Sequence, residues 1–314
     1  MGRIGRKKVV ITGGFGYIGA AVARELLGRG VSVHTLTGRV PPEASPLTSA
    51  PLLFDREYLV RELRGADAFV NTWWVRLPEH GLTFAEAVER SRLLLTAAEE
   101  AGVSRIVHVS VSNAAAGRNL GYYEGKARVE ELVRNLGTSV AIVRPTLVVG
   151  RDDVLTNNIA WLLRRFPLFL LPDGGRCRLQ PVTLDDTGRL VADLVEQDRA
   201  LEVDAAGPRI LTFGEYVKAV AEACGLRRLA VPVPPWVALL ALRLVGRILG
   251  DVVLSREEWL GLKQELLVSQ DPPTGRESVT DWLATHGPTL GARYVHDWRR
   301  HCGTGRTEAV SAGR

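Results

Sequence analysis

The strongest constraint on this chain is the regular alternation of short apolar runs with helical patterns that continues as far as Pro145. The apolar runs predict strands at 8–12, 31–36, 51–54, 68–72, 105–110 and 139–145, and the 3.6-residue patterns predict helices at 17–30, 57–66, 84–102 and 122–137. Parallel strands need crossover connections, and helices supply them here. We therefore expect a doubly wound α/β domain, a parallel sheet with helices on both faces.

After Pro145 the alternation loosens. We expect helices at 154–166 and 184–197, short strands at 178–182 and 209–213, and a mostly helical chain from Phe213 onward. The predicted organisation is a doubly wound α/β domain over 1–210, to which a smaller, mostly helical cap over 211–302 is added. Residues 151–178 are open to either part, and the polar segment 303–314 is expected to be disordered.

Composition excludes several classes of protein. With 46% hydrophobic and 24% charged residues, the chain resembles an ordinary globular protein. The net charge of +5 is dispersed, so we expect no nucleic-acid partner. The three cysteines form no C-x-x-C pair and the histidines show no metal-ligand spacing, so neither a disulfide framework nor a metal site is expected.

Location follows from the same features. A reducing cytoplasm suits the cysteines, and the N-terminus shows no signal-peptide pattern. The apolar stretch 234–254 is interrupted by Arg243, Arg247 and Asp251, so no membrane span is predicted. This stretch is open to several roles: core of the cap, wall of a lipophilic pocket, subunit interface (for example of a homodimer) or contact with a membrane surface.

A glycine-rich loop joins the first strand to the first helix. The segment TGGFGYIG covers Thr12 to Gly19, and its position between strand and helix makes it a specific signal for dinucleotide binding. We therefore predict that residues 1–210 form an NAD(P)-binding Rossmann domain. Such a loop brings bare backbone to a pyrophosphate, whose charge lies on the unpaired N–H groups of the helix. We expect a side chain at Gly14 or Gly16 to collide with the ligand. The predicted cofactor contacts of the loop are Gly13, Gly14, Phe15, Gly16, Tyr17, Ile18 and Gly19.

The second strand indicates which nicotinamide cofactor is bound. In NAD-preferring domains an acidic residue about 20 positions beyond the loop accepts the ribose hydroxyls. Here Thr37 stands near that position and Arg39 follows it. A guanidinium pairs with a 2′-phosphate, whereas a carboxylate repels it. We therefore expect NADP(H), with NAD(H) as the alternative.

These motifs resemble the short-chain dehydrogenase/reductase superfamily. The T-G-x-x-G-x-x-G loop and the segment RPTLVVG at 144–150 are similar to its extended and atypical members, especially the NAD-dependent epimerase/dehydratase-like group. The resemblance covers about the first 200 residues. It implies that Asp55 lies by the adenine and that Asn71, Thr72 and Pro145 also contact the cofactor.

The resemblance also implies a catalytic site. Tyr122 and Lys126 match the family's Y-x-x-x-K pair, and their spacing places both on one helical face. A tyrosine hydroxyl transfers protons poorly at neutral pH unless a nearby cation lowers its pKa, and Lys126 supplies that cation while it holds the nicotinamide ribose. A serine hydroxyl would polarise the substrate carbonyl. Ser112 is the first candidate and Ser110 the second, although Ser112 is only ten residues before Tyr122.

The predicted function is an NADP(H)-dependent oxidoreductase that interconverts a carbonyl and a secondary alcohol on a small organic substrate. Two alternatives remain: a nucleotide-sugar epimerase or dehydratase with tightly bound NAD(P), and a non-catalytic NADPH-binding assembly or regulatory protein. Trp73 and Trp74, just after the fourth predicted strand, either wall the substrate pocket or pack in the core.

Overall fold

The computed structural model describes residues 7–78 and 82–296, and its largest element is a parallel sheet. The strands of this sheet are β1 (Lys8–Thr12), β2 (Ser32–Thr37), β3 (Thr48–Pro51), β4 (Ala68–Asn71), β5 (Arg105–Val109), β6 (Ser139–Pro145) and β11 (Leu201–Ala205). They lie in the order β11-β6-β5-β4-β1-β2-β3, and every pair is parallel. The predicted doubly wound α/β fold is confirmed.

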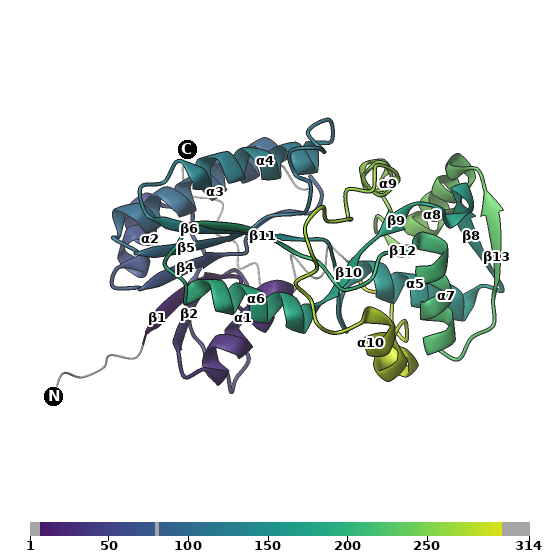
Figure 1. The fold of residues 1–314 in the computed structure, drawn as a ribbon, viewed down its shortest axis with the longest axis horizontal. Helices are drawn as coiled ribbons and strands as arrows, with labels where there is room; N and C mark the ends of the chain where they lie inside the picture. Colours follow the sequence, from purple (N-terminus) through teal and green to yellow (C-terminus); the bar gives the residue numbers. More distant parts are fainter. Residues whose placement is uncertain (1–6, 79–81, 297–314) are drawn as a thin grey trace.

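Helices cover both faces of the sheet (Figure 1). One face carries α1 (Tyr17–Gly28) and α6 (Leu184–Val195), and the other carries α2 (Arg56–Leu63), α3 (Phe84–Glu100) and α4 (Gly121–Arg134). Side chains alternate along each strand, so Val9 and Ile11 pack towards α1 and α6 while Val10 packs towards α2 and α3. This burial on both faces explains the nearly continuous apolar runs in the sequence.

Two strands of the parallel sheet differ from the sequence prediction. Strand β3 ends at Pro51, whereas the predicted strand begins there. The prediction relied on an apolar pattern, but this partly exposed edge strand is defined by its backbone pairing with β2. Strand β11 was not predicted, because acidic residues alternate with its apolar ones. One of them, Glu202, bonds Arg134 and Arg144, so ion pairing makes this strand compatible with the sheet.

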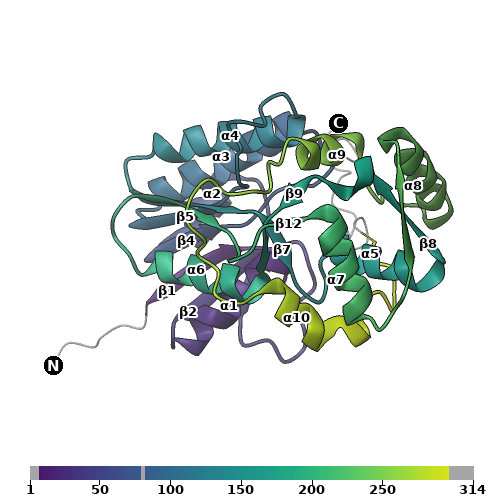
Figure 2. The same cartoon turned by 45° about the vertical axis from the view of Figure 1, so that its right-hand side comes forward.

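The remaining elements form the cap and its connections. Its helices are α5 (Val154–Arg165), α7 (Phe213–Ala223), α8 (Pro235–Leu249), α9 (Arg256–Lys263) and α10 (Val279–His286), with short 3-10 helices at Asp173–Gly175 and Gly287–Thr289. Its strands pair as β7 (Leu147–Val149) with β10 (Pro181–Thr183), β9 (Arg178–Leu179) with β12 (Leu211–Thr212), and β8 (Leu168–Pro172) with β13 (Leu229–Val233). The predicted, mostly helical C-terminal region is confirmed, and Figure 2 shows α5, α7 and α8 grouped at the end far from β1.

The cap is tied back to the parallel sheet. Asn113, after β5, donates hydrogen bonds to the carbonyls of Leu266 and Val268, over 3.0 and 2.7 Å. The backbone N–H groups of Arg276 and Glu277 donate to Asp186, at the start of α6. The segment between α9 and α10 therefore lies along the sheet domain, and the predicted disordered segment 303–314 lies outside the described residues.

Candidate functional site

The site begins where the strand order reverses, between β1 and β4. At such a switch point the loops after neighbouring strands separate and leave a crevice at the carboxyl ends. A cavity of about 1280 Å³ opens there and extends between the sheet domain and the cap. Its walls include the glycine-rich loop, the segments after β2, β4 and β5, the start of α4, and cap residues from α5, β8, α8 and α9.

The glycine-rich loop is shaped by contacts within the protein. Gly13 has a φ of +69°, which favours glycine, and its carbonyl accepts a hydrogen bond from the Gly16 N–H over 2.6 Å. A Cβ on Gly19 would lie 2.2 Å from that same carbonyl. A Cβ on Gly14 would meet Thr35 and one on Gly16 would meet Gly13, both within the protein. These glycines let the loop close on itself, and the expected collision of a side chain at Gly14 or Gly16 with a ligand stays a prediction.

Not every loop residue predicted to contact the cofactor faces the cavity. The loop residues that line it are Gly13, Gly16, Tyr17, Ile18 and Gly19. The loop residues Gly14 and Phe15 are not among the lining residues. The Gly14 N–H donates to the Thr35 hydroxyl over 2.7 Å, and the Phe15 carbonyl accepts from Arg39.

Buried polar side chains connect the start of the glycine-rich loop to the segment after β4. The Thr12 hydroxyl donates to the Asn71 side-chain oxygen over 3.0 Å and accepts the N–H groups of Thr72 and Trp73. Asn71 is fully buried and its amide lies 3.3 Å from Nδ1 of His108. Asn71 therefore positions the chain after β4, whereas Thr72 and Trp73 line the cavity. Burial and the nearby Lys126 lower the pKa of His108 well below its usual value.

Arg39 lies across the glycine-rich loop. Its guanidinium donates a 2.6 Å hydrogen bond to the Phe15 carbonyl, and its backbone N–H donates to the Thr37 hydroxyl over 3.0 Å. Thr37, Gly38 and Arg39 all line the cavity, so this end of it carries a cation after β2. Asp55, in contrast, accepts the Tyr58 N–H over 2.8 Å and caps α2. The structure gives Asp55 this local role and does not include it among the cavity-lining residues.

Tyr122 and Lys126 both line the cavity from the first two turns of α4. The Lys126 side chain is almost fully buried and donates from Nζ to the Val109 carbonyl over 2.9 Å. Its ammonium also lies 4.8 Å from the ring centre of Trp74. Burial lowers the pKa of Lys126 to about 7, although Glu130 one turn further along acts in the opposite direction.

Aromatic rings fix the position of Tyr122. Its ring packs edge to face against those of Trp74, Phe84 and Tyr123, with ring centres 6.2, 6.0 and 5.5 Å away. These contacts hold the ring at the cavity wall, because edge-to-face packing restricts both its position and its tilt. The neighbouring Tyr123 is buried, and burial raises its pKa.

The hydroxyls of the two candidate serines donate to other groups of the protein. The Ser112 hydroxyl is fully buried and donates to the Leu266 carbonyl over 2.6 Å, so its assignment as the catalytic serine is corrected. The Ser110 hydroxyl donates to Glu130 over 2.6 Å, although Ser110 belongs to the cavity wall. Pro145 also lies outside the wall: its carbonyl accepts the Ser112 N–H, and the next residue, Thr146, lines the cavity.

Sequence reasoning missed the charged pair beside the cavity. Arg76, after β4, bonds Glu258 of α9 over 2.7 Å, and both residues line the cavity. Glu258 also completes the capping box of α9 with Ser255. The S-x-x-E pattern at 255–258 was the available signal for the cap, but nothing local predicts its partner. Among the described residues, no group of three or more His, Cys, Asp or Glu side chains is placed to hold a metal ion.

Comparisons with known proteins agree with this geometry. A family model described as the NmrA-like family matches residues 5–206. The 40 kDa subunit of the mitochondrial NADH-ubiquinone oxidoreductase of Neurospora crassa is 25% identical over 58% of this chain and 48% of its own length. A 4-hydroxy-2-methyl-3-oxo-4-farnesyl-3,4-dihydroquinoline-1-oxide ketoreductase of Stigmatella aurantiaca is 30% identical over 46% of this chain and 52% of its own length. The chain thus matches about half the length of these curated relatives.

Solved structures show the same fold. A nucleoside-diphosphate-sugar epimerase of Staphylococcus aureus superposes with a TM-score of 0.70 at 16% identity, over 88% of this chain and 99% of its own. An NADPH-dependent quinone oxidoreductase of Escherichia coli, solved with NADPH, superposes with a TM-score of 0.69 at 18% identity, over 88% and 99%. At 16% and 18% identity these likenesses show a shared fold.

Proposed function

The chain belongs to the NmrA-like family, and from this premise we propose that it is an NADP(H)-dependent oxidoreductase that interconverts a carbonyl and a secondary alcohol on a small organic substrate. The observation that carries the proposal is that Tyr122 and Lys126 line the same cavity as Gly13 and Arg39. A dinucleotide that rests on the glycine-rich loop would extend along this cavity towards the tyrosine hydroxyl.

The residues of the loop fit a dinucleotide. Gly16 precedes the first turn of α1, whose N–H groups lack helical partners and suit a pyrophosphate. The Arg39 cation suits the 2′-phosphate that distinguishes NADP(H) from NAD(H), and no acidic residue among the described wall residues of this end repels it. When bound, reduced nicotinamide supplies a hydride for carbonyl reduction.

The chain's own residues would handle the proton. The Tyr122 hydroxyl would donate its proton to the substrate oxygen as negative charge develops there. The Lys126 ammonium, one turn along α4, would stabilise the resulting phenolate. Trp74 would stabilise the cationic form of Lys126 through its ring face. Because the Ser110 hydroxyl donates to Glu130 and the Ser112 hydroxyl to the Leu266 carbonyl, Tyr122 would act on the substrate oxygen without a serine.

The cap half of the cavity favours an apolar substrate. Aliphatic and aromatic side chains dominate its wall, including Ile159, Leu162, Phe169, Leu242, Val245 and Trp259. A sugar nucleotide would need cationic partners for its diphosphate. No arginine or lysine of the described part of the cap lines the cavity, and Arg76, which lines it from the segment after β4, is paired with Glu258. This argues for the oxidoreductase over the alternative nucleotide-sugar epimerase or dehydratase.

A second candidate function is a non-catalytic, NADPH-binding assembly or regulatory protein. The hydroxyls of Ser110 and Ser112 already donate to other protein groups, which favours this candidate. Without a serine hydroxyl the site has one fewer hydrogen-bond donor for a reacting carbonyl. The Neurospora relative is a subunit of NADH-ubiquinone oxidoreductase, which favours the same candidate. Tight NADPH binding without turnover is the outcome that this candidate predicts.

One experiment separates the three candidates. In one arm the purified protein is incubated with NADPH and a panel of apolar ketones, aldehydes and quinones. In the other arm it is incubated with UDP-glucose and NAD+ or NADP+, and reduced nicotinamide is followed by absorbance in both. Net loss of NADPH with an apolar carbonyl compound supports the oxidoreductase. A changed sugar without net cofactor consumption supports the epimerase. Binding of NADPH with no product from any compound contradicts both enzymes.

A further inference from the structure

Helix α8 carries an apolar stripe that faces away from the protein. Trp236, Leu240, Leu244 and Ile248 recur every four residues, and their exposed fractions are 68%, 51%, 56% and 86%. Buried or half-buried side chains of the same helix face inward, and Ala238, Leu242 and Val245 among them line the cavity. The helix is therefore apolar on both sides, whereas the outer side of a helix on a monomeric protein is ordinarily polar.

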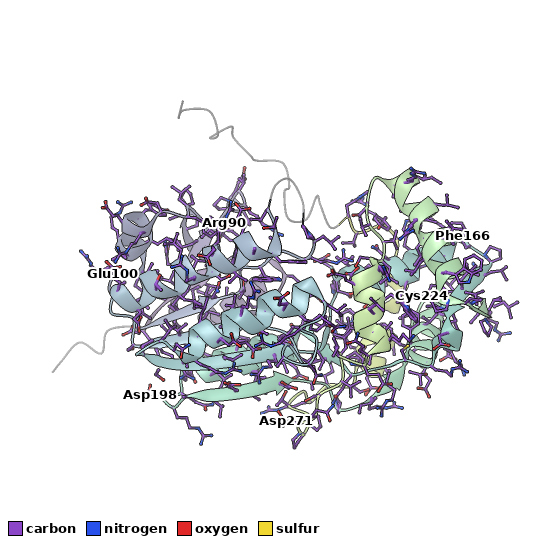
Figure 3. The ribbon with its side chains drawn as sticks, turned by 90° about the horizontal axis from the view of Figure 1, so that it is seen from above. Arg90, Glu100, Phe166, Asp198, Cys224 and Asp271 are labelled. Atoms are coloured by element: carbon purple, nitrogen blue, oxygen red, sulfur yellow. The ribbon has the colours of Figure 1, made fainter. Side chains whose placement is uncertain are left out.

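Further exposed apolar residues lie on neighbouring elements. Helix α8 packs on β8, where Leu168 is 49% exposed and lies opposite Leu229, itself 64% exposed on β13. Phe166, just before β8, is also exposed, and Figure 3 shows it at the outer end of the cap. Figures 1 and 2 both place α8 and β8 at the end of the molecule far from β1. The apolar surface is thus an end face and is accessible to a large, flat partner.

The charge beside the stripe is of one sign. Arg243 and Arg247 are exposed one turn apart on α8, and the sequence of α8 contains no acidic residue. Asp251, just after the helix, has a side chain that is only 2% exposed, so it does not offset this charge at the surface. Arginines next to exposed leucine, isoleucine and tryptophan complement a surface that is anionic outside and apolar beneath.

The length of α8 limits how it can meet a membrane. Its 15 residues span about 22 Å, less than the roughly 30 Å hydrocarbon core of a bilayer. Among residues 7–78 and 82–296, no helix is long and apolar enough to cross a membrane. A helix of this length and composition lies in the plane of the interface, with its apolar side chains at the boundary between headgroups and acyl chains.

We propose that α8 docks the cap onto the surface of an anionic lipid bilayer. Trp236, Leu240, Leu244 and Ile248 enter the interface, and Arg243 and Arg247 contact lipid phosphates. A second copy of the chain fits this face less well, because a two-fold contact along α8 brings the arginines of both copies together and the helix has no carboxylate to pair with them.

The test is flotation of the full-length protein with vesicles of phosphatidylcholine, with and without phosphatidylglycerol. We expect the protein to float with the anionic vesicles, and less so as salt is raised. Leu244→Glu/Ile248→Glu should weaken the partition coefficient by about tenfold or more, because two apolar side chains no longer leave water. Arg243→Gln and Arg247→Gln should each weaken binding to anionic vesicles by about fivefold.

Ile210→Glu is the matched control, because Ile210 is also an exposed apolar residue, 46% accessible, but lies outside α8. It should float like the wild type, and all variants should keep the wild-type melting temperature. The proposal is overturned if the wild type floats with neither kind of vesicle. It is also overturned if Leu244→Glu/Ile248→Glu floats as well as the wild type. Light scattering gives a further test. If the wild type is a dimer and Leu244→Glu/Ile248→Glu is a monomer, the membrane proposal is overturned and the face is assigned to a second copy of the chain.

Discussion

The ammonium nitrogen of Lys126 lies 4.8 Å from the ring centre of Trp74, and the two residues come from different segments of the sheet edge. Trp74 follows β4, whereas Lys126 lies on α4 after β5. The same ammonium donates to the Val109 carbonyl, so the cation is held by a ring face and a carbonyl in a buried position. Burial lowers its pKa to about 7, which makes the charge of this site sensitive to pH near neutrality.

Removing Lys126 should change how stability depends on pH. Because burial lowers the pKa of Lys126 from 10.5 to about 7, the unfolded chain binds more protons than the folded chain between these values. The free energy of unfolding therefore increases as the pH rises from about 7 to 10.5. Below about pH 7 the contribution of Lys126 to stability is at its least favourable. Lys126→Met should lack this rise and should be the more stable protein below about pH 7.

Urea unfolding at a series of pH values measures this difference. Lys218→Met is the matched control, because the Lys218 side chain is 76% exposed on α7. Its stability should follow the wild-type pH curve. Parallel curves for Lys126→Met and the wild type would contradict the account of the buried ammonium.

Replacing Tyr122 with phenylalanine should remove proton transfer and keep the packing. The ring contacts with Trp74, Phe84 and Tyr123 need no hydroxyl. Turnover of an identified substrate should fall by about a hundredfold or more, while NADPH affinity stays near that of the wild type. Tyr123→Phe, in the adjacent position, should retain activity. Equal activity of Tyr122→Phe and the wild type would exclude the tyrosine as proton donor.

Arg39→Ala should alter the choice of cofactor. Loss of a charged partner for the 2′-phosphate should weaken NADPH binding by about tenfold to a hundredfold, while NADH binding changes little. Titration calorimetry with each nucleotide measures both affinities. Arg61→Ala, which removes an arginine of α2 that is 67% exposed, should change neither. A similar loss of affinity for both nucleotides in Arg39→Ala would show that Arg39 only supports the loop.

Two glycines of α1 should respond oppositely to alanine. At Gly19 the added Cβ would lie 2.2 Å from the Gly13 carbonyl, so Gly19→Ala should destabilise the protein by roughly 1–3 kcal/mol or more. At Gly28 nothing lies within 4 Å, so Gly28→Ala should be neutral or stabilise by up to about 1 kcal/mol. Thermal unfolding of both variants is the measurement. Equal melting temperatures would contradict the close approach of α1 to the loop.

The sequence predicted the parallel sheet because its strands are buried on both faces and read as apolar runs. It did not predict β11, whose Glu202 is compatible with the sheet only because Arg134 and Arg144 lie beside it in the fold. The edge strand β3 was misplaced because backbone pairing with β2, rather than an apolar pattern, determines its position. Local patterns thus predict strands that hydrophobic burial defines, and miss strands that distant partners define.

In the candidate site, too, local patterns predicted some residues, and distant partners determine the others. The glycine-rich loop and the pair Tyr122 and Lys126 were predictable, because their spacing along one loop or one helix already places them together. The direction of the Ser112 hydroxyl was not, because its acceptor is a carbonyl of a distant cap segment. The same holds for Arg76, whose partner Glu258 lies on α9. Contacts between the sheet domain and the cap depend on the whole fold.

The most direct test of the account is a calorimetric titration of the purified wild-type protein with NADPH and, separately, with NADH. The cavity that begins at Gly13 and Arg39 and reaches Tyr122 should take up one NADPH molecule per chain, more tightly than NADH. Absence of binding by either nucleotide to the folded protein would contradict the account, because every proposed role of Tyr122 and Lys126 depends on that cofactor.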